Sequence, residues 1–372
     1  MNGRERFCKV MAFEPADRLP DYELGCWGQT VERWFREGMP RDTLHLNWFE
    51  GEPYFNIGRR GFAHVNIGMV PLFDYEVIEE TGRYVVARHG NGIVTKALKE
   101  GTARGTRMCM DQYLSFPVTD RESFSEIKKR YDPGSLVRYP QWWDQWVKIW
   151  QARDYPLCLL GNGTFGLYSQ LRSWVGTERI SYLFFDDPAF VEEMIDFNTE
   201  FLLSVTEKAL GEAAFDYFNF FEDFAGKGGP LISPQIFRKF FLPYYRKIID
   251  RFRKAGTEYF WLDSDGDPEA LIPLMLEAGI TCLWPLEQAS GMDPVRLRQE
   301  YGKALALAGG IDKRELAKDR KAIEKELYAK IPPLLESGGY IPHLDHTFSP
   351  EISYENFRYY LELKRKLTAG RS

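Results

Sequence analysis

The sequence predicts an α/β protein built as a single (β/α)8 TIM-type barrel with an irregular N-terminal extension that contains a β-hairpin. From about residue 156 onward, short apolar segments alternate with helical patterns, the order expected of parallel strands joined by outer helices. No linker rich in Gly, Ser or Pro divides the 372 residues, so we expect one domain over residues 1–372. Residues 1–150 hold the irregular part and the first barrel units, and residues 151–372 hold the regular strand–helix units.

The N-terminal part shows short, isolated patterns. Arg4–Phe13 and Thr30–Glu37 have the spacing of short helices. Arg83–Lys99 alternates apolar and polar residues around Asn91-Gly92, which is typical of a hairpin turn. Four tryptophans recur at helical spacing, and we expect them to pack in the core rather than to form a platform for a substrate: Trp142, Trp143, Trp146 and Trp150.

Six short apolar segments are the predicted strands of the regular part. They are Pro156–Gly161, Phe215–Phe221, Glu258–Leu262, Ile280–Pro285, Ala304–Ala308 and Tyr340–Pro342. Predicted helices lie among them at Pro188–Gly211, Ser233–Gly256, Pro268–Gly279, Arg320–Gly338 and Ser349–Leu367. Ser233-Pro234 supplies an N-cap followed by proline at the first helical position, and Gly279 is a C-cap candidate.

Composition and charge exclude several classes of function. The net charge is −6 and no stripe of Lys and Arg is present, which argues against nucleic-acid binding. No run of about 18 apolar residues predicts a membrane span. Met1–Arg6 is polar and charged, without the pattern of a signal peptide. The five cysteines form no CxxC pair, which favours the reducing cytoplasm and argues against a structural zinc knuckle.

Ionisable side chains follow five consecutive predicted strands. The carboxyl ends of barrel strands meet at one mouth, so these side chains are expected to converge there. Crowded carboxylates repel one another unless they are protonated, paired or bound to a metal, which indicates acid–base chemistry or a cation site. The residues are Glu222 and Asp223, Asp263 with Asp265 and Asp267, Glu287, Asp312, and His343 with Asp345 and His346.

Some of these residues have a simpler local explanation. Asp267 precedes Pro268 and is expected to cap its helix, and Asp312 can equally cap a helix. Asp223 can pair with Lys227. No comparable explanation exists for Asp263, Asp265 and His346, which are therefore the functional candidates.

Gly161–Gly166 matches G-x-G-x-x-G after an apolar strand. A dinucleotide-binding fold needs an acidic residue that closes the next strand, but Leu167–Val175 and Glu178–Phe185 both look helical. We therefore favour a tight loop that lines the barrel mouth and contains Asn162. The remaining histidines have no metal-ligand spacing and are expected to be surface or structural residues: His45, His64 and His89.

Several segments, taken in order, carry a family resemblance. They are Arg4–Phe7 with Asp17–Pro20, Phe221–Gly226 followed by Ile232–Pro234 and Leu242–Tyr244, Gly309–Asp312, and Gly338–His346 with Glu355–Phe357. Together they resemble the uroporphyrinogen decarboxylase and methylcobamide methyltransferase superfamily over most of the chain. The resemblance implies a (β/α)8 barrel with its cleft at the C-terminal mouth.

The sequence departs from the decarboxylases at the substrate clamp. In those enzymes, arginines of an N-terminal segment hold the carboxylates of the porphyrinogen. The corresponding segment here, Glu23–Gln29, contains no arginine. Glu222 also stands where that family has Asp. Heme-pathway decarboxylation is therefore not expected of this chain.

The resemblance to the methyltransferase branch implies a metal site. That branch holds zinc on an H-x-C motif and a later cysteine, and the matching positions here are Asp263, Asp265 and His346. Two carboxylates and one imidazole are harder ligands than the thiolates of that branch. Zinc is the first expectation for such a site, and manganese or iron is also compatible with it. Such a Lewis acid suits an oxygen or nitrogen substituent better than a thiol.

The resemblance implies a corrinoid-dependent methyltransferase. It would move a methyl group between a small O-, N- or S-methyl compound and the corrinoid of a carrier protein, and a homodimer is the expected assembly. Glu222, Glu287 and Asp223 are the expected catalytic residues, and Tyr22, Asn162, Asp312 and His343 are the expected substrate-binding residues. Two alternatives stay open: a uroporphyrinogen decarboxylase-like carboxy-lyase, and a non-catalytic barrel that binds a corrinoid or tetrapyrrole.

Overall fold

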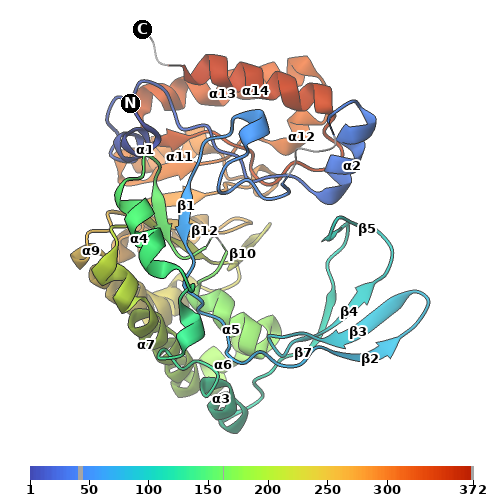
Figure 1. The fold of residues 1–372 in the computed structure, drawn as a ribbon, viewed down its shortest axis with the longest axis vertical. Helices are drawn as coiled ribbons and strands as arrows, with labels where there is room; N and C mark the ends of the chain where they lie inside the picture. The colour runs from blue at the N-terminus through green and yellow to red at the C-terminus, as the bar shows by residue number, and fades with distance from the viewer. Residues whose placement is uncertain (41–44, 162, 370–372) are drawn as a thin grey trace.

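The computed structural model describes residues 1–40, 45–161 and 163–369 and forms a barrel around a curved parallel sheet (Figure 1). Each of the six predicted strands coincides with an observed strand, although β12 extends one residue past the predicted end, to Asp263, so the predicted fold class is confirmed. In the described residues the sheet has seven strands in the order β1 (Gly61–Ala63), β8 (Leu157–Leu159), β9 (Tyr217–Phe221), β12 (Tyr259–Asp263), β13 (Cys282–Trp284), β14 (Ala306–Ala308) and β15 (Tyr340–Ile341).

An N-terminal segment, residues 19–27, closes the barrel between the two edges of this sheet. On one side the backbone N–H of Gly58, which leads into β1, donates to Asp21 O at 2.7 Å. On the other side Phe348, which follows β15, donates its backbone N–H to Gly25 O at 2.9 Å. The segment thus takes the place of an eighth strand, although it makes only isolated bridges.

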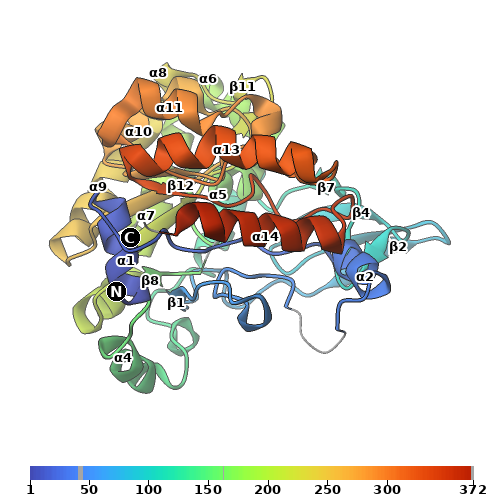
Figure 2. The ribbon, with the colours of Figure 1, turned by 90° about the horizontal axis from the view of Figure 1, so that it is seen from above.

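Helices cover the outside of the sheet, as the sequence predicts. They are α5 (Leu167–Val175), α6 (Thr177–Asp186), α7 (Pro188–Glu212), α8 (Pro234–Ile236), α9 (Leu242–Lys254), α10 (Ile272–Ala278), α11 (Pro294–Tyr301), α12 (Lys313–Leu316), α13 (Arg320–Ser337) and α14 (Tyr354–Thr368). The last two lie side by side (Figure 2).

Two predicted helices differ from the structure in detail. The helix predicted from Ser349 begins only at Tyr354, because the Ser353 side chain accepts the N–H of Asn356 and caps it there. The helix predicted over residues 233–256 is divided by a π-helical turn, Phe237–Phe241. Its predicted start is confirmed, since Ser233 caps α8 through the N–H of Ile236.

The N-terminal helices α1 (Gly3–Met11), α2 (Gly28–Arg36), α3 (Arg121–Lys128) and α4 (Trp143–Gln151) flank the barrel. The Phe7 ring of α1 stacks on Trp261 inside the barrel, with ring centroids 5.8 Å apart. The tryptophan prediction holds for half of its members: Trp143 and Trp150 are buried, but Trp142 and Trp146 are exposed.

A four-stranded antiparallel sheet projects from the barrel as an arm (Figure 1). It consists of β2 (Glu76–Glu80), β3 (Tyr84–Arg88), β4 (Val94–Leu98) and β7 (Gln112–Ser115), and β3–β4 is the predicted hairpin. Between β4 and β7 the short hairpin β5 (Thr102–Ala103)–β6 (Thr106–Arg107) returns to α2. There the backbone N–H of Gly28 donates to Thr106 Oγ1 at 2.7 Å, and we call this hairpin the strap.

In the part of the chain that the structure describes, no helix is both long enough and apolar enough to cross a lipid bilayer.

Candidate functional site

The mouth of the barrel, where the parallel strands end, carries the predicted functional residues. Pairing between β9, β12 and β13 places Phe221, Asp263 and Trp284 in one layer across the sheet. Side chains alternate along a strand, so Trp261 lies one layer deeper on the same face as Asp263. Since Trp261 contacts Phe7 inside the barrel, the Asp263 side chain also faces the interior.

Asp265 and His346 meet at this mouth. Asp265 Oδ2 lies 3.9 Å from His346 Nε2, and their side chains are 49% and 36% exposed, so a substrate can reach both. Burial, followed by the charges of Glu287 and Asp223, raises the pKa of Asp265 to about 6. Burial, followed by the charge of Lys313, lowers the pKa of His346 to about 4. The pair therefore combines an uncharged imidazole with a carboxyl group that titrates near neutrality.

Thr347 and Trp27 hold the imidazole of His346 in place. Thr347 Oγ1 lies 2.9 Å from His346 Nδ1, and it accepts a hydrogen bond from Trp27 Nε1 at 2.7 Å. Trp27 belongs to the segment that closes the barrel, so barrel closure and the orientation of His346 are linked. Neither Thr347 nor Trp27 stood out in the sequence, because their contact joins positions 320 residues apart.

Glu287 supports the loop after β12. Its Oε2 accepts the backbone N–H of Gly266 at 2.8 Å and the hydroxyl of Ser290 at 3.1 Å. Its charge acts on both Asp265 and His346. Among the predicted catalytic residues, Glu287 is the one whose charge acts on both members of the Asp265–His346 pair.

Asp263 carries a carboxylate that makes no hydrogen bond or ion pair with the residues that the structure describes. Burial, followed by the charges of Asp265 and Asp223, raises its pKa well above the ordinary value. An unpaired acidic group in this position needs a proton or a cation for its stability.

Glu222 has a structural place instead. Its carboxylate lies at the N-terminus of α5, where it accepts backbone N–H groups from Leu167, Tyr168 and Ser169, and it also accepts the Tyr245 hydroxyl at 2.5 Å. Burial raises its pKa to about 7, and these four donors oppose that rise. Both oxygens are fully engaged, which leaves no position from which Glu222 could exchange a proton with a substrate.

Asp223 pairs with Arg172 rather than with Lys227. The Arg172 guanidinium donates to Asp223 Oδ2 at 2.7 Å and also to its backbone carbonyl. The side chain stays 48% exposed, and its charge reaches Asp263 and Asp265. Asp223 thus contributes to the electrostatics of the mouth, with its own charge offset by Arg172.

The predicted substrate-binding residues are spread over different environments. Tyr22 is buried under the Arg60 guanidinium, which lies 4.7 Å from its ring centroid. Asp312 caps α12 through the N–H of Arg314 and pairs with the Arg314 side chain at 2.7 Å, as its capping interpretation predicts. Asn162 lies outside the described residues.

His343 faces the barrel interior beside Trp284, with ring centroids 6.1 Å apart. Its Nδ1 lies 2.7 Å from Leu344 O, and because a carbonyl can only accept, Nδ1 carries the proton. Nε2 is then a buried acceptor, and it has no partner among the described residues. Burial lowers the pKa of His343 to about 3, so this acceptor stays uncharged.

Two residues of the mouth were not among the predicted site residues. Asp345 is buried and joins two loops, since its carboxylate accepts the backbone N–H groups of Gln288 at 3.0 Å and Lys313 at 3.1 Å. Lys313 is the cation whose charge acts on Asp265, His346 and Asp345. A signal was present in the sequence, because Lys313 directly follows Gly309–Asp312, one of the segments that carry the family resemblance.

The three predicted metal ligands do not form a ready-made metal centre. Asp265 and His346 approach each other, but in the described residues no group of three or more His, Cys, Asp or Glu side chains is arranged to hold a metal ion. The donors present therefore do not fit a preformed three-ligand site, and we route no chemical step through a metal.

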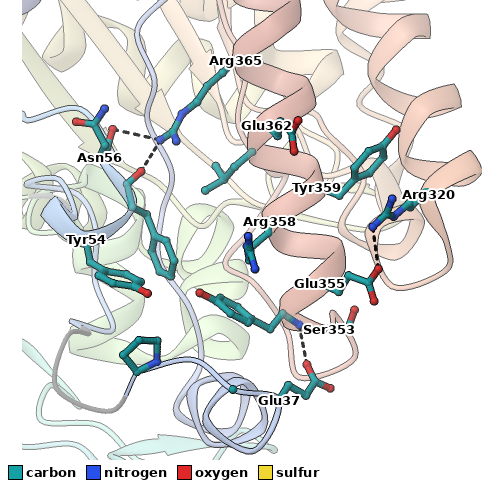
Figure 3. A pocket seen from close by; sticks show the side chains of 15 residues that line it. Glu37, Tyr54, Asn56, Arg320, Ser353, Glu355, Arg358, Tyr359, Glu362 and Arg365 are labelled. Carbon is teal, nitrogen blue, oxygen red and sulfur yellow. Dashed lines mark hydrogen bonds and ion pairs between the residues drawn. The ribbon is translucent and has the colours of Figure 1, made fainter.

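A separate pocket of about 1620 Å³ lies beside α14 (Figure 3). Its lining is mostly polar and includes Arg358, Tyr354 and Glu362. Arg365, at one end, donates to Asn56 O at 3.2 Å, and Arg320, at the other, pairs with Glu355 at 2.8 Å. None of the predicted site residues lines this pocket.

The chain is similar to known proteins in sequence pattern and in fold. The uroporphyrinogen decarboxylase (URO-D) family pattern matches residues 145–367, more than half of the chain. A methyltransferase from Methanosarcina mazei is similar in structure, with a TM-score of 0.60 and 16% identity over 98% of this chain and 99% of that one. This likeness shows a shared fold.

A B12-independent methionine synthase from Shewanella sp. W3-18-1 has a TM-score of 0.36 and 13% identity, over 63% of this chain and 68% of that one. No curated protein matches the sequence. The superfamily resemblance predicted from the ordered motifs is confirmed by the family pattern, which spans β8 to α14. The chain belongs to the uroporphyrinogen decarboxylase (URO-D) family.

Proposed function

We propose that this protein is a methyltransferase that moves a methyl group between a small O-, N- or S-methyl compound and the corrinoid of a carrier protein. The observation that carries the proposal is the exposed Asp265–His346 pair at the mouth, with Asp263 and Glu287 beside it. A bound corrinoid would supply the nucleophile that accepts the methyl group.

Asp265 assists the atom from which the methyl group departs. When the bond to the methyl group breaks, its electron pair stays on the oxygen, nitrogen or sulfur atom. A protonated Asp265 can then give its proton to a departing oxygen or sulfur. With an ammonium donor the electron pair cancels the positive charge and the amine leaves neutral, so an ionised Asp265 binds the cation before the transfer. His346, uncharged near neutral pH, does not fix Asp265 as a carboxylate in the way that an imidazolium would.

The second candidate is a carboxy-lyase, because the family pattern is that of a decarboxylase. The charges at the mouth favour the methyltransferase. A porphyrinogen with many carboxylates would meet Asp263, Asp265 and Glu287, whereas in the described part of the chain Lys313 is the cation that acts on both residues of the pair. Repulsion between like charges disfavours such a substrate.

The test uses purified protein with free cob(I)alamin as the methyl acceptor and a panel of methoxy, methylamino and methylthio compounds. Asp265→Asn and His346→Gln are each expected to lower the rate about 10²- to 10⁴-fold, the usual effect of removing an acid–base group. Asp74→Asn, in an exposed loop, is the matched control and should keep the full rate.

The proposal fails if no compound methylates the corrinoid while uroporphyrinogen is decarboxylated. Rates measured with added Zn²⁺ and Mn²⁺ will show whether the predicted divalent metal takes part. Rates that are unchanged by either ion, and by prior chelation, would remove the metal from the proposal and leave the side-chain roles.

A further inference from the structure

The mouth holds one acidic and one basic side chain that have no partner among the described residues. On one side the carboxylate of Asp263 makes no hydrogen bond or ion pair with the described residues. On the other side the Lys313 ammonium has no carboxylate within 4 Å and no hydrogen-bond acceptor in that part of the chain. Alongside burial, the charge of Asp265 raises the pKa of Asp263, and the charge of Lys313 acts on Asp265, so both side chains border the site of Asp265.

Neighbouring contacts keep Lys313 free. The adjacent Asp312 is occupied by Arg314, with which it makes a hydrogen-bonded ion pair. The carboxylate of Asp345 accepts the backbone N–H of Lys313 and that of Gln288, so it is engaged by backbone rather than by the ammonium. The backbone at Lys313 is therefore fixed while its charged end remains available.

The aromatic rings of this mouth suit a methylated cation. Phe221 shares the layer of Asp263 and is 38% exposed, so a ligand at the mouth can contact its ring. Trp27 lies over the loop of His346 through its bond to Thr347. Rings of this kind bind quaternary ammonium groups through their negative faces.

Two buried polar atoms on either side of this layer also lack partners in the described chain. They are Nε2 of His343, an acceptor, and Nε1 of Trp261, a donor, and their side chains are 2% and 1% exposed. Buried polar atoms are nearly always hydrogen-bonded, so such orphans indicate a place where a ligand or its water completes the structure.

Resting on the proposed function, we infer that the methyl donor is a zwitterion, a methylated ammonium compound that also carries a carboxylate. The ammonium group would lie against Asp263 and Asp265 near Phe221, and the carboxylate would bind Lys313. A purely cationic donor would leave Lys313 unpaired, and a purely anionic one would meet three carboxylates.

Three small probes separate these possibilities by calorimetry in the absence of any corrinoid. Trimethylglycine carries both charges, choline carries only the ammonium, and 3,3-dimethylbutanoate has the same shape as trimethylglycine but only the carboxylate. Trimethylglycine is expected to bind about tenfold or more tightly than either of the other probes, the usual effect of one charge-assisted contact.

Lys313→Met is expected to lower the affinity for trimethylglycine to that for choline and to leave the affinity for choline unchanged. Lys313→Arg should retain most of the affinity for trimethylglycine. Lys318→Met, which removes an exposed lysine paired with Glu315, is the control and should bind all probes normally. The inference is overturned if choline binds as tightly as trimethylglycine, or if Lys313→Met binds trimethylglycine normally. A matched thermal melt of each variant shows that it is folded.

The outcomes also distinguish this inference from the proposed function. Methyl transfer from uncharged methoxy compounds, without binding of trimethylglycine, would overturn the inference and support the function. Lys313-dependent binding of trimethylglycine, without methyl transfer to any corrinoid, would support the inference and overturn the function.

Discussion

Glu222 and Asp265 are both acidic residues near strand ends, yet their surroundings give them different tasks. Glu222 is fully buried and accepts four hydrogen bonds at the start of α5. Asp265 is half exposed and faces an imidazole across 3.9 Å. The number of donors around each carboxylate, rather than its position in the sequence, separates a helix cap from a reactive group.

Glu222→Gln tests this separation. The amide has one acceptor oxygen in place of two, so at least one backbone N–H of α5 loses its partner. We expect a loss of roughly 1–3 kcal/mol in the free energy of unfolding, measured with denaturant, and a nearly unchanged rate per folded molecule. A rate that falls 100-fold with unchanged stability would instead make Glu222 catalytic.

Asp265→Asn should change stability with pH in a defined direction. The folded-state pKa of Asp265 is raised to about 6, so the ionised carboxyl disfavours folding above that pH, and its cost disappears below the unfolded value near 4. Asn has no such cost. At pH 7.5 we expect the variant to melt about 1–2 °C above the wild-type protein, a small difference because solvent screens a half-exposed charge. Near pH 4 we expect the two proteins to melt at the same temperature.

The comparison uses Asp74→Asn, which alters an exposed loop carboxyl, as the control for a change in net charge. Equal melting temperatures of Asp265→Asn and wild-type protein at pH 7.5 would contradict the electrostatic account of the mouth.

At the scale of elements, the strap ties the arm to α2 through a close backbone approach. A Cβ atom on Gly28 would lie 2.1 Å from Ala103 O and 2.8 Å from Thr106 Oγ1, so only glycine allows this contact. Gln29 adds a side-chain bond from Nε2 to Gly101 O at 2.8 Å. The arm is therefore held at two ends, by the barrel and by α2.

Gly28→Ala is expected to release the strap. The added methyl group should cost roughly 1–3 kcal/mol, as overpacking usually does, and should expose residues 101–107 to limited proteolysis. Gly82→Ala is the control, because a Cβ there meets nothing within 4 Å. Equal cleavage of the two variants within the strap would show that Gly28 does not hold it.

The sequence predicts the elements of this barrel better than it predicts their contacts. Strand and helix positions from β8 to α14 follow from local apolar patterns, and Ser233 and Gly279 cap helices as expected. The convergence of strand ends predicts that Asp265 and His346 lie at one mouth, and the structure places their side chains 3.9 Å apart. The engagement of Glu222 and the Trp27–Thr347 contact depend on side chains far apart in sequence, which local patterns do not encode.

At the scale of the whole molecule, a buried ionic network fastens the closing segment to α14. Lys364 is buried and pairs with Asp21 at 2.8 Å and Glu23 at 2.5 Å, and the Tyr360 hydroxyl donates to Glu23 at 2.5 Å. Glu23 also accepts the backbone N–H of Leu344 at 3.2 Å, just before the loop that carries His346. The network thus joins barrel closure to the geometry of the mouth.

Lys364→Met leaves Glu23 as a buried charge without its counterion, and we expect a loss of roughly 3–5 kcal/mol in the free energy of unfolding. The double variant Glu23→Gln/Lys364→Met removes both charges and should be more stable than Lys364→Met alone. Denaturant unfolding measures both. Strictly additive losses would show that the two side chains do not interact.

Because residues 19–27 and the segment after β15 close the barrel together, barrel closure is expected to be a late step in folding. Thr30 Oγ1 donates to Phe348 O, a contact that spans 318 positions. Contacts between residues so far apart in sequence form late, because closing so long a loop has a large entropic cost. A growing polypeptide on the ribosome would hold β1 to β14 as an open sheet with exposed edges until the last two elements emerge. Chaperone binding to the nascent protein is therefore expected to persist until synthesis has passed α14.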